Sequence, residues 1–303
     1  MKTAFLTSPG RPASLAPSCL TRDLADFPIG NRALRRHQLE MLEAQGFALA
    51  DSPASASLVV SGDSWISSAD LAKLLLSREP SVLIAPGGHL LAWTSPTATA
   101  PDHATKVFAD ADSLALVHPW DLLRAHELHL TSLTKDLIHG TVSPLASISG
   151  PLHLGKGSVI LPGVVTEGPV VVGENCKLGP NCYLRGGVSL GDNCHIGNAV
   201  ELKNCLVLAK TNIGHLSYAG DSVIGEKCNF GAGTIVSNLR HDGGNHRSMV
   251  GGTLVDTGRR KFGTIFGDGV KTGIQTGVYG GRKIWPGLST LPGQKVDRDI
   301  TNV

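Results

Sequence analysis

Apolar positions recur every six residues over much of the second half of the chain. Written in sixes from Ile148, the chain gives twelve hexads up to Ala219, and ten of their first residues are aliphatic. Glycine often follows, and the fifth residue is usually small or β-branched, as at Cys176 and Cys194. Such a hexad predicts one short strand and one corner of a β-helix, with the aliphatic residue pointing inward. Three hexads make a coil of about 18 residues, so residues one coil apart stack at about 4.8 Å.

The repeat is interrupted twice. We expect the register to slip by four residues after Ala219 and to resume at Ile224. The repeat stops again over 242–265, and sixes return at Phe266. A regular triangular prism has no pocket, so these interruptions are expected to form a ledge and a loop.

Residues 1–118 show alternating strand and helix signals instead. The expected elements are strands at 4–8 and 55–63, helices at 31–47 and 67–80, and a hairpin at 81–94 around a Pro-Gly-Gly turn. This alternation predicts a small α/β domain. Leucines at helical spacing predict a connecting helix over 119–140, and the β-helix domain is expected over 141–303.

The composition narrows the functional classes. The 303 residues carry a formal net charge of +2 without a long basic run, so no electrostatic footprint for nucleic acid is present. No apolar stretch reaches membrane-spanning length, and the N-terminus lacks the pattern of a secretory signal. We expect a soluble cytoplasmic protein that binds neither nucleic acid nor membrane. The six cysteines form no CxxC pair, which argues against a zinc site, and their placement favours buried core thiols rather than disulfides.

Two cations and one histidine are the candidate chemical groups. Arg185 and Lys203 lie three hexads apart at outward hexad positions, so they should stack one strand spacing apart and repel each other. An anion such as a sugar phosphate would relieve this repulsion. The alternative is a solvated face that Glu201 partly neutralises. His215 follows Gly214, where the coil leaves open space, and is a candidate general base or an exposed structural histidine.

Four long segments resemble one enzyme family. They read HPWDLLRAHE, LRGGVSLGDNCHIGNAVELKN, GHLSYAGDSVIGEKCNFGAGTIVSNLRHD and VDTGRRKFGTIFGDGVKTGI. Together they resemble the acetyltransferase half of the bifunctional glucosamine-1-phosphate N-acetyltransferase/UDP-N-acetylglucosamine pyrophosphorylase family, most of all the archaeal type of sugar-1-phosphate nucleotidylyltransferase. The resemblance implies a left-handed parallel β-helix that assembles as a homotrimer with sites between subunits. It also implies an N-acetyltransferase that uses acetyl-CoA and an amino-sugar 1-phosphate.

The same resemblance assigns roles to residues. It implies a general base at His215, an amine- and acetyl-orienting Asn238, a phosphate clamp of Arg185 and Lys203, sugar contacts at Tyr218 and Asn229, and coenzyme A binding near Gly231, Ala232, Gly233 and Gly273. A lysine that follows the second asparagine in bacterial relatives has no assigned counterpart, and Arg240 or Arg247 could replace it. The basic triplet Arg259, Arg260 and Lys261 either contacts coenzyme A phosphates or lies in a solvated loop.

The N-terminal part resembles a shortened nucleotidylyltransferase. FPIGNRALRRHQLEMLEAQGF and LVVSGDSWIS match that family, and the second would place a metal-binding aspartate at Asp63. The phosphate-cradling loop is reduced to LTSPGRPAS, which argues against Mg²⁺-dependent nucleotidyl transfer. Two alternatives therefore remain beside the acetyltransferase: a nucleotidylyltransferase whose β-helix only assembles subunits, and a non-catalytic scaffold that binds sugar nucleotides.

Overall fold

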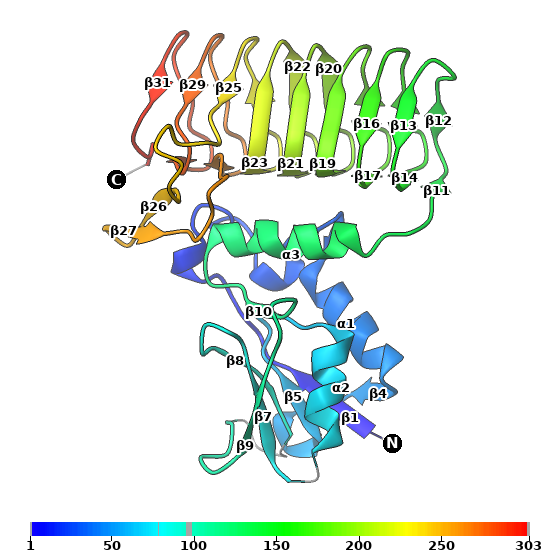
Figure 1. Ribbon diagram of the computed structural model, residues 1–303, viewed down its shortest axis with the longest axis vertical. Helices are drawn as coiled ribbons and strands as arrows, with labels where there is room; N and C mark the ends of the chain where they lie inside the picture. Colours follow the sequence, from blue (N-terminus) through cyan, green and yellow to red (C-terminus); the bar gives the residue numbers. More distant parts are fainter. Residues whose placement is uncertain (1, 78, 95–98, 302–303) are drawn as a thin grey trace. The chain divides into compact units, whose positions relative to one another are not determined.

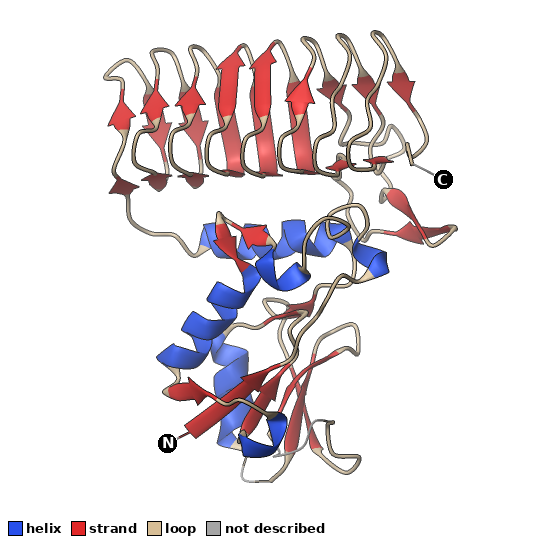
Figure 2. Cartoon of the chain, turned by 180° about the vertical axis from the view of Figure 1, so that it is seen from behind, coloured by secondary structure: helices blue, strands red, loops and turns tan. Residues whose placement is uncertain are grey.

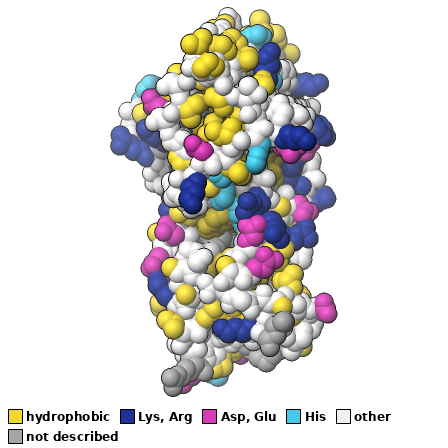
Figure 3. All heavy atoms as spheres, turned by 90° about the vertical axis from the view of Figure 1, so that its right-hand side faces the viewer, with side chains coloured by type: hydrophobic (Ala, Val, Ile, Leu, Met, Phe, Trp, Pro, Cys, Tyr) yellow, Lys and Arg dark blue, Asp and Glu magenta, His cyan; other side chains and the backbone are white. Residues whose placement is uncertain are grey.

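The chain folds into two compact units in a computed structural model that describes residues 2–77, 79–94 and 99–301. Unit 1 comprises residues 1–12, 22–28 and 32–121, and unit 2 comprises 13–21, 29–31 and 122–303. Figure 1 shows their elements, and Figure 2 shows that helices and strands alternate in the first whereas strands dominate the second. No helix among the described residues is both long enough and apolar enough to cross a membrane. On the face in Figure 3, Lys and Arg side chains are interspersed with Asp and Glu.

Unit 1 is the α/β layer that the sequence predicts. Its six-stranded sheet has the order β4-β1-β5-β8-β7-β9, in which β1 pairs in parallel with β4 and β5. Leu58, Leu71 and Leu83 are fully buried in its core. The strands are β1 (Lys2–Leu6), β4 (Phe47–Leu49), β5 (Leu58–Val60), β7 (Ser81–Ile84), β8 (Leu90–Trp93) and β9 (Thr105–Phe108), with short strands β2 (Pro28–Ile29), β3 (Arg32–Ala33), β6 (Ser64–Trp65) and β10 (Leu114–Ala115).

The helices of unit 1 are shorter than expected. α1 (Leu34–Ala44) begins after the predicted start at 31, because Asn31 has a φ of 65° that an α-helix does not accommodate. α2 (Ser68–Leu76) begins as predicted after the cap residue Ser67, whose Oγ accepts a hydrogen bond from the Asp70 amide at 3.1 Å. It ends before the predicted 80. The expected hairpin at 81–94 is confirmed by the antiparallel pairing of β7 and β8.

The predicted connecting helix over 119–140 is too long. α3 (Pro119–Thr131) ends where two side-chain hydroxyl groups donate hydrogen bonds to backbone carbonyls of its last turn. Thr131 Oγ1 donates to the Glu127 carbonyl at 2.9 Å, and Ser132 Oγ donates to the His129 carbonyl at 2.7 Å. Leu137, which was expected on this helix, instead begins the first strand of the β-helix.

The larger unit is a parallel β-helix with three faces, as the hexads predict. The first face contains β12 (Thr141–Val142), β15 (Val159–Ile160), β18 (Lys177–Leu178), β20 (His195–Asn198), β22 (Asn212–His215) and β24 (Asn229–Phe230). The second contains β13 (Ser147–Ser149), β16 (Val165–Glu167), the first halves of β19 (Tyr183–Leu190), β21 (Glu201–Val207) and β23 (Tyr218–Ile224), then β25 (Ile235–Val236), β29 (Gly277–Val278) and β31 (Lys295–Val296). The third contains β11 (Leu137–Ile138), β14 (Leu152–Leu154), β17 (Val170–Val172), the second halves of β19, β21 and β23, then β28 (Ile265–Phe266) and β30 (Lys283–Ile284).

One inward side chain from each hexad fills the axis of this β-helix. Ile160 pairs in register with Leu178, and Leu178 pairs with Ile196, so apolar residues stack from coil to coil. Five cysteines lie in the same core as free, buried thiols, in agreement with the sequence interpretation: Cys176, Cys182, Cys194, Cys205 and Cys228. Burial raises the pKa of the Cys182 thiol to about 12, so this group stays protonated. The hexapeptide-repeat fold predicted from the sequence, a left-handed parallel β-helix, is therefore confirmed.

The predicted four-residue slip after Ala219 is wrong. Arg185 pairs with Lys203, one full coil of three hexads later, but Val188 pairs with Cys205, which comes one position too early for a full coil. The single residue Asn204, at a φ of 51°, takes the place that two residues occupy in the coil below. Three consecutive buried residues follow at 206–208, so two hexad registers fit the apolar pattern equally well and the sequence pattern hid the omission.

The second interruption lies where the sequence predicts it. Val223 pairs with Ile265 rather than with a residue one regular coil later, so an insertion lengthens the coil between them. The insertion contains the antiparallel strands β26 (Arg247–Val250) and β27 (Thr253–Asp256). Regular pairing over one full coil returns between Ile265 and Lys283.

Candidate functional site

The corner between the second and third faces, which we call the polar corner, changes its chemistry along the β-helix. In the early coils it is formed by glycines with positive φ, from Gly150 and Gly168 to the Gly186–Gly187 pair. In the next three coils the equivalent positions are Asn204, Asp221 and Asn238, and each step between them is one position shorter than a regular coil. Side chains replace hydrogen atoms at the same corner, so a column of polar groups forms there.

Asp221 is the centre of this column. Its carboxylate accepts hydrogen bonds from Asn204 Nδ2 at 2.9 Å and from Asn238 Nδ2 at 2.5 Å. Lys203 Nζ donates to both of its oxygens, at 2.7 and 2.9 Å. The side chains of Lys203 and Asp221 are only 15% and 3% exposed, so this ion pair lies away from water. The sequence interpretation missed Asp221, although the even spacing of three Asx residues, each one position short of a full coil, was a visible signal.

The predicted stacking of Arg185 on Lys203 is confirmed, but the expected repulsion between them is not present. The two residues are direct neighbours in the pairing of β19 and β21. Arg185 Nη2 forms an ion pair with Glu201 Oε1 at 2.7 Å, and this contact raises the pKa of the guanidinium. Since Asp221 neutralises Lys203, two carboxylates balance the two cations. The structure therefore contains the alternative arrangement, in which nearby carboxylates neutralise the charges of Arg185 and Lys203.

Tyr218 converges with Asn238 above Lys203. A Cβ atom added at Gly220 would lie 2.5 Å from both Tyr218 Oη and Asn238 Nδ2, so only glycine leaves room for this approach. Burial raises the pKa of the Tyr218 phenol, and the nearby charge of Asp221 raises it further. The structure thus brings together four residues that the sequence interpretation selected: Arg185, Lys203, Tyr218 and Asn238.

The polar column continues towards α3 and the insertion. Asn204 Nδ2 also donates to Glu127 Oε1 of α3 at 2.7 Å. Glu127 forms an ion pair with Arg259, with Nη1 donating to Oε2 at 3.3 Å. Burial alone would raise the pKa of Glu127, but its hydrogen bond and ion pair with Arg259 outweigh burial and lower the pKa. Arg259 is therefore held inside the molecule, whereas its neighbours Arg260 and Lys261 are exposed.

His215 and the predicted coenzyme A residues occupy a different corner, between the first and second faces. His215 ends β22, is exposed, and pairs in register with Asn198. Gly231, Ala232 and Gly233 form the same corner one coil later. A Cβ on Gly231 would lie 2.5 Å from the carbonyl carbon of Gly273, which places Gly273 in the next coil.

Asn229 lies neither at the polar corner nor at the corner that carries His215. It is exposed on the first face, where its Oδ1 accepts a hydrogen bond from Asn212 Nδ2 at 2.9 Å. Within one chain, the predicted residues therefore lie on two corners and one further face rather than around one enclosed cavity.

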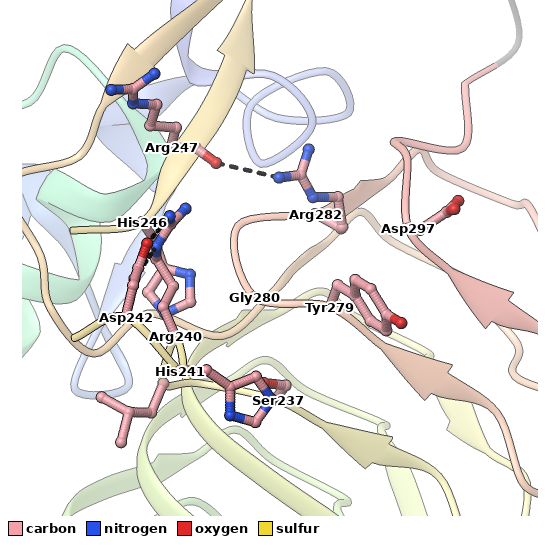
Figure 4. A pocket seen from close by; sticks show the side chains of 11 residues that line it. Ser237, Arg240, His241, Asp242, His246, Arg247, Tyr279, Gly280, Arg282 and Asp297 are labelled. Carbon is pink, nitrogen blue, oxygen red and sulfur yellow. Dashed lines mark hydrogen bonds and ion pairs between the residues drawn. The ribbon is translucent and has the colours of Figure 1, made fainter. Parts of the chain in front are cut away.

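A cavity of about 660 Å³ lies beside Asn238, between the start of the insertion and the turn after β29. Figure 4 shows Arg240 beside Asp242 on one side, with Tyr279 and Asp297 on the other. Arg240 donates to Asp242 Oδ1 at 2.9 Å, which lowers the pKa of that carboxyl. Arg247 and Arg282 also line the cavity, and Arg282 Nη2 donates to the Arg247 backbone carbonyl at 3.4 Å. The Arg282 Nε is buried and has no hydrogen-bond partner among the described residues.

Asp63 in unit 1 was the predicted metal ligand. It lies beyond β5, and its Oδ1 accepts a hydrogen bond from Ser61 Oγ at 2.5 Å. No group of three or more His, Cys, Asp or Glu residues is placed to hold a metal ion in the described parts of the chain. The adjoining Gly62 lies so close to the segment after β1 that a Cβ there would be 2.1 Å from the Thr7 carbonyl oxygen.

Comparisons with known proteins agree with the family resemblance. Residues 166–287 match the family described as the GMPPB C-terminal domain. The chain is 43% identical over 185 residues to the bifunctional protein GlmU of Methanococcus maripaludis, covering 60% of this chain and 44% of that protein. It is 35% identical over 202 residues to the bifunctional sugar-1-phosphate nucleotidylyltransferase/acetyltransferase of Sulfurisphaera tokodaii, covering 66% of this chain and 50% of that protein. The predicted similarity to archaeal bifunctional proteins of this type is therefore confirmed.

The chain spans about half the length of these relatives. Among solved structures, the acetyltransferase domain of PglB from Neisseria gonorrhoeae is 13% identical, with a TM-score of 0.25 over 99% of this chain and 93% of that domain. A likeness this weak says nothing about ligands.

Proposed function

We propose that this protein is an acyltransferase that moves an acetyl group from acetyl-CoA to the amine of an amino-sugar 1-phosphate. The observation that carries the proposal is the 43% identity over 185 residues to a bifunctional GlmU protein.

The proposed reaction needs a base, because an amine attacks a thioester only after it loses its proton. The exposed imidazole of His215 would accept this proton while the nitrogen bonds to the acetyl carbon. The carbon–sulfur bond then breaks, and the proton passes to the departing thiolate of coenzyme A. Asn238, with its amide held against Asp221, would orient the amine and the acetyl group.

The sugar phosphate is proposed to bind Arg185 more directly than Lys203. Arg185 and Glu201 are 36% and 34% exposed, so an incoming phosphate can compete with Glu201 for the guanidinium. The Lys203 ammonium is enclosed and already bonded to both oxygens of Asp221. Tyr218 and Asn229 remain proposed sugar contacts.

The cavity beside Asn238 is a second place for anionic groups. Three arginines line it, Arg240, Arg247 and Arg282, against two carboxylates, Asp242 and Asp297. We propose that it receives phosphate groups of one of the two substrates. Asp242 already holds Arg240, and the Arg247 guanidinium points away from the cavity (Figure 4), so we assign neither arginine the role of the missing lysine.

A homotrimer would bring the separate groups together. Large apolar side chains are exposed around the corner that carries His215, namely Leu216, Ile235 and Ile274. Covering them in a subunit interface would place the His215 corner of one subunit against another subunit. A mass measurement in solution tests this, with three times the chain mass expected and a monomeric mass contradicting it.

The function is tested by thiol release from acetyl-CoA over a panel of amino-sugar phosphates, with product identified by mass spectrometry. We expect an N-acetylated sugar phosphate from the wild type and a loss of about 10²- to 10⁴-fold in His215→Ala, because the amine loses its base. His195→Ala is the matched control, since His195 lies on the same face and is not part of the proposed site. An inactive wild type, or an active His215→Ala, would contradict the proposal.

A further inference from the structure

The polar corner contains a carboxylate that the β-helix does not need for its own construction. Glycines with φ between 67° and 98° close this corner in the coils that contain Gly150, Gly168 and Gly186–Gly187. Just after Val278, Gly280 closes it again beyond Asn238. Between these glycine corners, side chains occupy the corner in three consecutive coils, which also contain Lys203, Tyr218 and Asn238.

The omission of one residue gives Asp221 its position. With one residue between Gly220 and Ser222 to turn the chain, Asp221 must take a left-handed φ of 51°. Asn and Asp tolerate this conformation better than other residues with side chains. The Gly263 amide also donates to the Asp221 carbonyl at 2.9 Å, so the insertion fixes the backbone from the other side.

Three side chains depend on the Asp221 carboxylate. Lys203, Asn204 and Asn238 all donate to it, at distances between 2.5 and 2.9 Å. Within residues 2–77, 79–94 and 99–301, Asp221 is the carboxylate that forms an ion pair with Lys203. Without this charge, a largely buried ammonium would lie next to Arg185 with no counter-ion, and it would move or draw in water.

We propose that Asp221 is a positioning residue that sets the Lys203 ammonium and the Asn238 amide for the amino-sugar phosphate. It touches neither substrate, and it acts through these two side chains. This inference rests on the proposed acyltransferase function. It also assigns a purpose to the shortened coils, since a full coil with two glycines at the corner would carry no carboxylate there.

A double-mutant cycle tests the proposal in the full-length protein. Asp221→Asn, Lys203→Met and the double variant are compared by steady-state kinetics with acetyl-CoA and glucosamine 1-phosphate as probes. We expect Asp221→Asn to lower kcat/KM for the sugar phosphate by about 10- to 100-fold, because small displacements of positioning groups have effects of this size. The KM for acetyl-CoA should stay within about twofold, and Asp221→Asn should have a smaller effect once Lys203 is already Met, because of the two side chains that it positions only Asn238 is then left to lose its contact.

Two further variants guard against a merely structural effect. Lys203→Arg keeps the ion pair but moves the cation, so it should fold normally and still lose kcat/KM for the sugar phosphate. Asp192→Asn is the control, because Asp192 is a corner carboxylate that accepts a hydrogen bond from the Glu174 amide, away from the site, and this variant should keep wild-type kinetics.

The outcomes are distinguishable. Independent, multiplying losses in the cycle, an equal loss for both substrates, or full activity of Asp221→Asn would overturn the positioning role while acyl transfer by the wild type stands. A wild type that acetylates no amino-sugar phosphate would instead overturn the proposed function itself. If Asp221→Asn does not fold, wild-type kinetics in Lys203→Arg would overturn the positioning role.

Discussion

The early and middle coils of the β-helix follow the same path but differ at one corner. In the early coils the corner is made of glycine, and the stability comes from stacked aliphatic residues such as Leu178. In the middle coils the corner carries Asn204, Asp221 and Asn238, with Lys203 buried beside them. The comparison shows that the repeat itself is a scaffold, and that one omitted residue in each of two coils is enough to install buried polar chemistry on it.

The comparison predicts the largest loss of stability in the early coils. Leu178→Ala removes a fully buried side chain and leaves a cavity between Ile160 and Ile196, so the free energy of unfolding should fall by about 2–5 kcal/mol. Chemical denaturation measures this change. The rate of acyl transfer per folded molecule should not change, and a specific loss of activity would show that the scaffold and the site are not separable in this way.

A smaller loss of stability is expected for a substitution at the edge of the polar column. Glu127→Gln leaves Arg259 without its charge partner in a place where both side chains are about one-fifth exposed, so stability should fall by about 1–3 kcal/mol. The same denaturation experiment measures it. Exposed Glu79→Gln serves as a control for the loss of a carboxylate. Equal stability of Glu127→Gln and the wild type would mean that α3 does not help to hold the insertion.

The boundary between the two kinds of coil should respond to pH. His126 of α3 is fully buried, near Ser189 of β19, and burial lowers its pKa to about 4, with Glu127 opposing this shift. The unfolded chain, with an ordinary pKa of about 6.5, then binds more protons between these values. Stability therefore falls as the pH drops from about 6.5 towards 4.

The predicted loss of stability at lower pH is tested by measuring the free energy of unfolding at pH 7 and at pH 5. The wild type should lose about 1–2 kcal/mol more than His126→Leu over that interval, because the variant has no imidazole to protonate. The same pH dependence in both proteins would show that His126 is not held neutral by burial.

The smallest change in stability is expected when an ion pair on the surface is removed. Lys210 Nζ lies 3.7 Å from Glu226 Oε1, and the lysine side chain is 55% exposed. Lys210→Ala should change the free energy of unfolding by less than about 0.5 kcal/mol, because water and salt screen such a pair. A loss as large as that of Glu127→Gln would remove the contrast between surface and enclosed charges on which the comparison depends.

Much of the fold followed from the sequence because the hexad period directly reports which residues point inward. The stacking of Arg185 on Lys203 was predicted for that reason. The omission of one residue at Asn204 was not predicted. Leu206, Val207 and Leu208 are all apolar, so the apolar pattern fits the hexad register with the omission and the one without it equally well. The end of α3 was missed because the leucines continue at helical spacing, while the hydroxyls of Thr131 and Ser132 stop the helix.

The candidate site was predicted less completely than the fold. Spacing showed that two cations are neighbours, but it could not show that Glu201 and Asp221 neutralise them, because side-chain pairing depends on rotamers and on the exact corner geometry. Asp221 looked like an ordinary polar residue until the shortened coil placed it between Asn204 and Asn238. The separation of His215 from Asn229 likewise depends on which face each residue occupies.

The most direct test of the account is the initial rate of acyl transfer by a variant in which two glycines replace Asn204. This change restores a full coil with the Gly-Gly corner that the chain already uses at 186–187. An extra glycine between Gly251 and Gly252, at an open hairpin tip, is the matched insertion control. We expect the corner variant to remain folded and to lose at least about tenfold in kcat/KM for the sugar phosphate, with the control unchanged. A folded corner variant that transfers acetyl groups at the wild-type rate would contradict the account.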